Sequence, residues 1–134
     1  MDTKTCKILL VEDNPVDAFV VTEALTKSGE VNFSVTRAER LGEAIDRLRA
    51  ENFDLVLLDF MLPDSEGLAT FSTVRLQAPD VPIVALTGVS NESVAVEAVR
   101  QGALDFLVKG QVQPATLKRA IHYALTCPRR IRTS

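Results

Sequence analysis

Short apolar runs alternate along the chain with segments whose apolar residues recur at helical spacing. The apolar runs predict strands at 7–11, 33–37, 54–59, 82–87 and 105–108. The intervening stripes predict helices that begin near Pro15, Leu41, Leu68, Ser90 and Pro114. Strict alternation of strand and helix indicates a parallel sheet with right-handed crossovers and helices on both faces. The expected fold class is therefore α/β, a doubly wound five-stranded parallel sheet in a three-layer sandwich.

Residues that cap helices mark several of the expected boundaries. Asn14, which precedes a proline, predicts the N-cap of the first helix. Ser90 is expected to cap the fourth helix, with Ala95, Ala98 and Val99 on its buried side.

Composition and charge narrow the class of protein. The chain has 134 residues, 46% of them hydrophobic, which suits one globular domain. Charged residues make up 25%, mixed in sign, with a formal net charge of -3, so no basic stripe faces a nucleic-acid backbone. The apolar runs fall far short of the roughly 20 residues that span a bilayer, and segment 1–7 is unlike a signal peptide. We expect a cytoplasmic protein with no membrane contact and no direct nucleic-acid partner.

The cysteines and the histidine do not form a metal or redox motif. Cys6 and Cys127 lie near opposite ends of the chain, without a CxxC pair, and are expected to be reduced thiols. His122 falls within a helical stripe beside Tyr123 and is expected on a helix surface rather than in catalysis.

The residues that follow the predicted strands carry the chemistry. In a doubly wound sheet, ligands bind beyond the carboxyl ends of the strands. Glu12 and Asp13 follow the first strand, Asp59 ends the third, Thr87 ends the fourth and Lys109 follows the fifth. Three clustered carboxylates are stable only if they are protonated, paired with a cation or bound to a metal. Because all the ligands are oxygen atoms, with few of them from protein, the pattern favours Mg²⁺.

Lys109 and Thr87 would form an anion site beside Asp59. An aspartate that faces a metal, an ammonium and a hydroxyl is arranged for attack on phosphorus, which would give an aspartyl phosphate. Each residue also has an ordinary structural explanation. A carboxylate at a strand end often caps the next helix, threonine is common in strands, and a lone lysine is usually solvated.

Four sequence segments resemble the receiver domain of two-component response regulators. They are ILLVEDN, LVLLDFMLPDSEG, PIVALTG and GALDFLVKG, and their order and spacing agree across residues 5–125. Residues 126–134 would then be a C-terminal tail or a truncated linker. The resemblance implies a flavodoxin-like (βα)5 sandwich with strand order 2-1-3-4-5.

The resemblance also implies residue roles. Asp59 would be phosphorylated by a histidine kinase or a histidine phosphotransfer protein. Mg²⁺ would be held by Asp13 directly, by Glu12 through water, by Asp59 and by the backbone carbonyl of Met61. The domain would be no enzyme, but would assist only its own phosphorylation and dephosphorylation.

The switch residues of the family fall on Thr87, Lys109 and Phe106, with Asp59, Lys109 and Thr87 assisting the chemistry. Phosphorylation would remodel the face formed by the fourth helix, the fifth strand and the last helix. That face would bind an output domain or a second copy, and Val94 and Val96 are expected to lie off the buried stripe there.

Three positions depart from the usual family pattern. Gly110 replaces the proline that often follows the lysine, so the Lys109–Gly110 peptide is expected to be trans. Phe106 has no phenol hydroxyl. Met61 and Val89 are apolar where some members have polar groups that help water reach the phosphoryl, so we expect slow self-dephosphorylation.

Two other functions fit part of the pattern. A phosphotransferase of the haloacid-dehalogenase kind also orders Asp, Ser/Thr and Lys along an α/β sheet, but it needs an acid where Met61 stands. A pseudo-receiver that binds partners without phosphorylation would not need the complete set of five residues.

Overall fold

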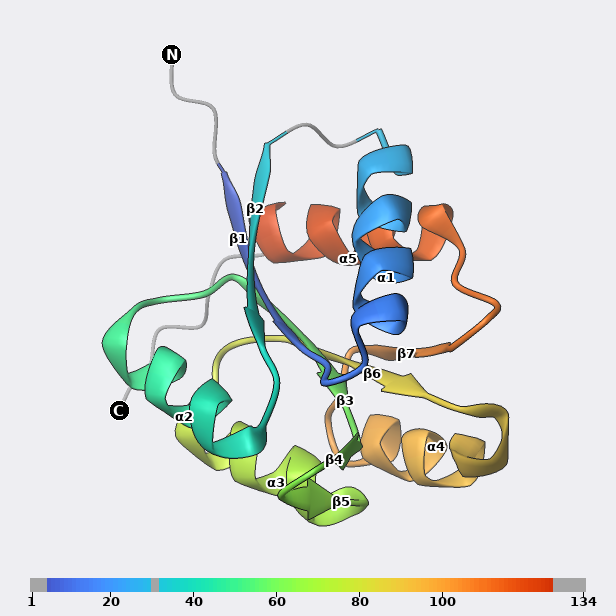
Figure 1. Ribbon diagram of the computed structural model, residues 1–134. Helices are drawn as coiled ribbons and strands as arrows, with labels where there is room; N and C mark the ends of the chain where they lie inside the picture. Colours follow the sequence, from blue (N-terminus) through green and yellow to red (C-terminus); the bar gives the residue numbers. More distant parts are fainter. Residues whose placement is uncertain (1–4, 30–31, 127–134) are drawn as a thin grey trace.

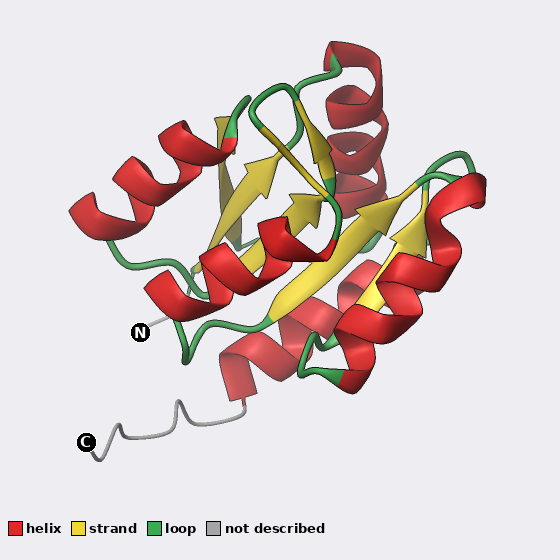
Figure 2. Ribbon diagram, turned by 90° about the horizontal axis from the view of Figure 1, so that it is seen from below, coloured by secondary structure: helices red, strands yellow, loops and turns green. Residues whose placement is uncertain are grey.

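The sheet has five parallel strands in the order β2-β1-β3-β6-β7, as predicted. A computed structural model of the chain describes residues 5–29 and 32–126. The strands are β1 (Cys6–Val11), β2 (Phe33–Ala38), β3 (Leu55–Asp59), β6 (Ile83–Thr87) and β7 (Asp105–Val108). Their arrows run in one direction, so their carboxyl ends meet at one edge (Figure 2).

Helices cover both faces of the sheet. Helices α1 (Pro15–Lys27) and α5 (Pro114–Thr126) lie on one face, and α2 (Leu41–Ala50), α3 (Leu68–Gln77) and α4 (Glu92–Arg100) lie on the other (Figure 1). Alternate residues of each strand feed two separate apolar clusters: Leu9 and Val11 join one cluster, and Ile8 and Leu10 join the other. All of β3 is buried, as expected of a central strand covered on both sides.

The segment after β3 is more ordered than the sequence indicated. It forms a two-stranded antiparallel hairpin of β4 (Met61–Leu62) and β5 (Ser65–Glu66). Between these strands, the Asp64 carboxylate accepts hydrogen bonds from the backbone N–H groups of Leu41 at 2.8 Å and Gly42 at 3.0 Å. These bonds lower the pKa of Asp64 and satisfy the first turn of α2.

The start of α4 differs from the prediction. A 3₁₀ turn (η1, Val89–Asn91) contains Ser90, and α4 begins at Glu92 without a side-chain cap. Ala95 and Ala98 are buried as predicted, but Val99 is 37% exposed. The buried stripe of α4 runs through Val94, Ala95 and Ala98, so Val94 packs against the core, contrary to the expectation, and only Val96 is exposed as expected.

Several other expectations concern the ends and the loops. Cys6 is buried, whereas Cys127 and the expected tail beyond Thr126 lie outside the described residues. His122 is on the exposed side of α5, as predicted. No peptide bond in the described ranges is cis, and Gly110 has a φ of 87°. No helix within these ranges has the length and apolar character needed to cross a membrane.

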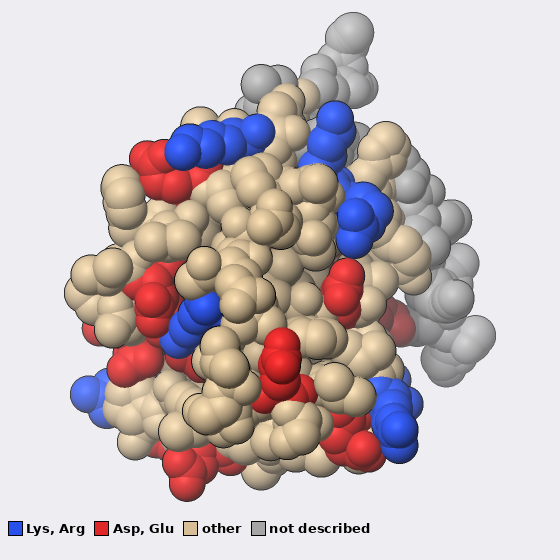
Figure 3. Space-filling view, turned by 90° about the vertical axis from the view of Figure 1, so that its right-hand side faces the viewer, with Lys and Arg blue, Asp and Glu red and all other residues tan. Residues whose placement is uncertain are grey.

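Charges of both signs are scattered over the surface. On the face drawn in Figure 3, Lys and Arg side chains are separated by Asp and Glu side chains and by uncharged surface. This distribution matches the mixed charge of the sequence.

Candidate functional site

The turn between β1 and α1 is fixed by bonds to its backbone. Asn14 caps α1: its Oδ1 accepts from the N–H groups of Val16 at 2.8 Å and Asp17 at 3.1 Å. From β2, Arg37 donates Nε to the carbonyl of Glu12 and Nη2 to the carbonyl of Asp13, both at 3.0 Å. This turn therefore presents the acidic pair in one defined arrangement.

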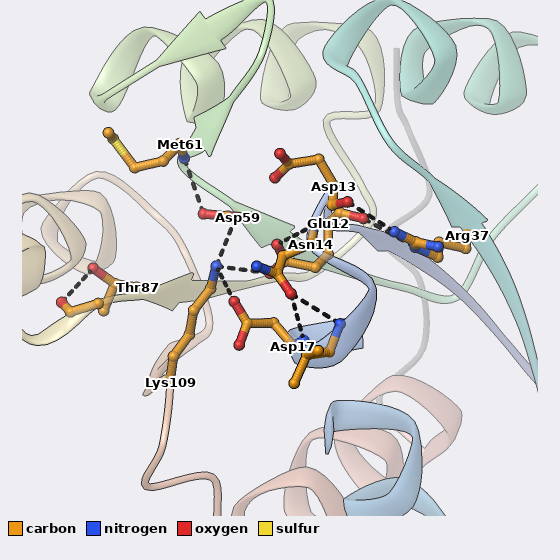
Figure 4. Close-up of polar contacts among 11 residues, drawn as sticks. Glu12, Asp13, Asn14, Asp17, Arg37, Asp59, Met61, Thr87 and Lys109 are labelled. Carbon is orange, nitrogen blue, oxygen red and sulfur yellow. Dashed lines mark hydrogen bonds and ion pairs between the residues drawn. The ribbon is translucent and has the colours of Figure 1, made fainter. Parts of the chain in front are cut away.

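The acidic pair meets Asp59 from the end of β3 (Figure 4). Glu12, Asp13 and Asp59 each offer a carboxylate oxygen, and these atoms all lie within 4.8 Å of one another. Glu12 is 0% exposed, Asp59 is 2% exposed and Asp13 is half-buried. Oxygen ligands at this spacing suit a hard divalent cation.

Lys109 supplies the positive charge at this edge. Its backbone N–H donates to the Thr87 carbonyl at 2.7 Å, which joins the loop after β7 to β6. Its Nζ lies 2.8 Å from Asp59 Oδ2, 2.9 Å from Glu12 Oε1 and 3.2 Å from Asp17 Oδ2. One ammonium therefore contacts three carboxylates.

Burial and mutual repulsion shape the charges of the site. Burial is the main cause that raises the pKa of Glu12 to about 7; the Lys109 ammonium opposes the rise, and neighbouring Asp59 adds to it. Burial alone would lower the pKa of Lys109, but its bonds to Asp59 and Glu12 outweigh that effect and raise the pKa. Glu12 Oε1 has the Lys109 ion pair but no hydrogen bond of good geometry. A buried carboxylate oxygen that accepts no hydrogen bond fits a site that takes a cation or its bound water.

Both Asp59 oxygens have partners. The Met61 backbone N–H donates to Oδ1 at 2.9 Å, and Lys109 donates to Oδ2. The Met61 side chain points away from Asp59 and is 48% exposed (Figure 4). The start of the β4 hairpin therefore orients the Asp59 carboxylate.

Thr87 and Phe106 lie at the same edge but outside this cluster. The Thr87 hydroxyl donates to the Gly88 carbonyl at 3.1 Å rather than to Asp59, although Thr87 is only 2% exposed (Figure 4). Phe106 is half-buried and packs against the apolar cluster on the side of α2, α3 and α4. The site thus brings Glu12, Asp13, Asp59 and Lys109 together, with the Met61 backbone beside Asp59, and leaves Thr87 and Phe106 outside these contacts.

Comparison with known proteins agrees with this arrangement. The model of the response regulator receiver domain family matches residues 8–122. The chain belongs to this family. Its members are regulatory domains, and the β2-β1-β3-β6-β7 sheet of this receiver domain is the family fold.

Full-length relatives are several times longer than this receiver domain. The chain is 32% identical to the transcriptional regulatory protein ZraR of Escherichia coli K12, covering 75% of this chain and 22% of ZraR. It is 37% identical to the regulatory protein LuxO of Vibrio cholerae, covering 75% of this chain and 21% of LuxO. The chain therefore spans about a fifth of the length of these relatives.

Solved structures give the same fold. The receiver domain of NtrX from Brucella abortus superposes with a TM-score of 0.76 at 29% identity, covering 90% of this chain and 99% of that one. The receiver domain of the sensor histidine kinase PA1611 from Pseudomonas aeruginosa has a TM-score of 0.73 at 29% identity, covering 91% and 98%. That structure has a magnesium ion coordinated in its active site cleft.

Two residues of this receiver domain were missed in the sequence. Arg37 closes the second predicted strand, so the rule about carboxyl ends could have found it. Asp17 lies in the first turn of the helix that Asn14 and Pro15 predict directly after the acidic pair, and that position places it near the same edge.

Proposed function

We propose that this receiver domain is a phosphoacceptor switch in which Asp59 takes a phosphoryl group from a partner histidine kinase or histidine phosphotransfer protein. The observation that carries the proposal is the buried Asp59 carboxylate, held between the Lys109 ammonium and the acidic pair of Glu12 and Asp13. Residues 5–125 form the functional unit.

The reaction is a phosphoryl transfer between side chains. An Asp59 oxygen attacks the phosphorus of a phosphohistidine, an O–P bond forms, and the N–P bond breaks with its electron pair on the imidazole, which takes a proton from solvent. Lys109 contacts the phosphoryl oxygens and offsets their charge, and the Thr87 hydroxyl turns from Gly88 to donate to them. The domain assists only this phosphorylation of Asp59 and its own later dephosphorylation, in which water attacks phosphorus, the bond from phosphorus to the Asp59 oxygen breaks and inorganic phosphate leaves.

A divalent cation fits the same site. Asp13, Asp59 and the backbone carbonyl of Met61 would bind Mg²⁺, with Glu12 reaching it through water. The fit rests on the clustered carboxylate oxygens and on Glu12 Oε1, which is buried and paired with Lys109 but accepts no hydrogen bond. When bound, Mg²⁺ neutralises charge on the carboxylates and on the phosphoryl oxygens.

The signal leaves through the face of α4, β7 and α5. A phosphoryl group adds about -1.5 to -2 charges, which draw Thr87 inward. Movement of Thr87 opens space that Phe106 can enter, because Phe106 is only half-buried in the adjoining strand. The remodelled face binds an output domain or a second copy, in the cytoplasm and without direct nucleic-acid contact.

The other two functions fit less well. A dehalogenase-like phosphotransferase needs an acid where Met61 lies half-exposed. A pseudo-receiver takes no phosphoryl group, so it would not require a buried Asp59 whose two oxygens accept from the Lys109 ammonium and from the Met61 backbone N–H.

Intact mass after incubation with acetyl phosphate and Mg²⁺ separates these functions. We expect the protein to gain one phosphoryl group without hydrolysing added phosphoesters. Turnover of those esters would favour the phosphotransferase, and an unchanged mass would favour the binding module.

A further inference from the structure

Asp17 lies in the first turn of α1, beside the site but without a role in the function proposed above. Its Oδ2 is 3.2 Å from Lys109 Nζ. Among the carboxylates around that ammonium, the Asp17 side chain is the most exposed, at 33% against 0% for Glu12 and 3% for Asp59. The ammonium is therefore shared between two enclosed acids and one acid that opens to solvent.

The backbone contacts in this region do not depend on the Asp17 carboxylate. The α1 cap uses the backbone N–H of Asp17, which donates to Asn14 Oδ1 and survives any non-proline substitution. Lys109 is anchored separately through its own N–H to Thr87. The side-chain pair of Asp17 and Lys109 can therefore change while the helix cap and the strand end remain.

We propose that Asp17 is a positioning residue that holds the Lys109 ammonium toward α1 in the resting protein and competes with the incoming phosphoryl group for it. This inference rests on the proposed function. The ammonium already pairs with three carboxylates, so a phosphoryl oxygen that pairs with it must displace one of them. Asp59 carries the phosphoryl and Glu12 is enclosed, whereas Asp17 can turn to solvent.

The competition would restrain phosphorylation. Asp17→Asn weakens the rival contact to Lys109, because a neutral amide attracts the ammonium less than a carboxylate does. At the spacing of the site and in a solvent-exposed setting, one charge should change the labelling rate by about threefold to tenfold. Salt should shrink the difference, because an exposed charge is screened.

The test follows labelling by acetyl phosphate and Mg²⁺ by intact mass. We expect Asp17→Asn to be labelled faster than the wild type and Asp17→Glu to stay close to it. Asp46→Asn is the matched control, because Asp46 is exposed on α2, across the sheet. In a Lys109→Met background, Asp17→Asn should have no further effect.

A second readout examines the resting protein. The NMR signal of the Lys109 side chain should shift in Asp17→Asn and not in Asp46→Asn. Unchanged or slower labelling of Asp17→Asn, equal acceleration in the Lys109→Met background, or an unmoved Lys109 signal would overturn the inference. A Lys109 signal that shifts in Asp17→Asn, together with a wild type that takes no label, would instead overturn the proposed function.

Discussion

The two sides of the site differ in how firmly they are held. On the α1 side, Arg37 fixes the carbonyls of Glu12 and Asp13, and Lys109 bridges the Glu12 carboxylate to Asp59. On the α4 side, the Thr87 hydroxyl bonds to its own neighbour, and a 3₁₀ turn without a side-chain cap follows, with Val89 66% exposed. The α1 side is therefore already ordered before phosphorylation. The α4 side, where the switch residue Thr87 lies, has bonds that it can exchange at low cost.

This difference separates two tasks. A phosphoryl transfer needs donors and charges in place in advance, because reorganisation during the reaction raises the barrier. A switch needs an element with a second arrangement of similar free energy. Changes on the α1 side should therefore alter chemistry and metal binding, and changes near α4 should alter lifetime and signal.

The largest effect is expected from Lys109→Met. Loss of the ammonium should slow labelling by acetyl phosphate about 100-fold, because one positioned donor to a phosphoryl oxygen is worth that much. Lys118→Met, which removes a charge from the exposed side of α5, is the control. Similar slowing in both variants would mean that net charge, and not the α1 side, governs the rate.

Glu12→Gln tests whether ionisation of the buried Glu12 carboxylate destabilises the folded protein. In metal-free wild type, the folded-state pKa of Glu12 is about 7 against 4.5 in the unfolded chain, so the folded protein binds the proton more tightly. The stability that this proton contributes is present at low pH and is lost as pH rises through about 7.

Relative to wild type, Glu12→Gln should therefore gain about 2 kcal/mol in free energy of unfolding between pH 5 and pH 8, since each pKa unit is worth about 1.4 kcal/mol. Urea unfolding in the presence of a chelator measures this difference, with Glu23→Gln on exposed α1 surface as control. If the difference in free energy of unfolding between Glu12→Gln and the wild type stays constant with pH, ionisation of Glu12 does not destabilise the fold.

Arg37→Met should weaken Mg²⁺ binding about tenfold, because residues that orient metal ligands typically contribute at least that much. Its two bonds hold the carbonyls of Glu12 and Asp13. Calorimetric titration with Mg²⁺ gives the affinity, and Arg49→Met on the exposed side of α2 is the control. Unchanged or tighter binding would show that the turn keeps its shape without Arg37.

The smallest effect is expected at Met61, at the start of β4, and it concerns the rate at which the phosphoryl group is lost. An amide can hold the attacking water and a methyl group cannot, so Met61→Asn should lose its phosphoryl group about threefold faster than Met61→Ala. The half-life of the labelled form, followed by intact mass, measures this. Faster loss from the alanine variant would refute the explanation that Met61 and Val89 exclude positioned water.

Most of the fold and of the site could be predicted because one rule joins distant residues. The carboxyl ends of parallel strands share an edge, so Glu12, Asp13, Asp59 and Lys109 could be placed together from their positions alone. The orientation of a hydroxyl does not follow from that rule. Thr87 accordingly lies at the predicted edge but bonds to Gly88.

The features that the sequence did not predict are very short strands or depend on tertiary contacts. The β4 and β5 strands have two residues each and leave no periodicity to detect. The pattern does not show which valine of α4 is buried, because Val94, Val96 and Val99 are equally apolar and only packing against the sheet separates them. Asp64 caps α2 from 22 to 23 residues away, a contact that only the folded chain creates.

The central claim is that Asp59 is the residue that accepts the phosphoryl group. Its most direct test is intact mass after acetyl phosphate and Mg²⁺, for the wild type, for Asp59→Asn and for Asp13→Asn. We expect one added phosphoryl group on the wild type, none on Asp59→Asn, and labelling of Asp13→Asn that needs more Mg²⁺. Retained labelling of Asp59→Asn would contradict the claim.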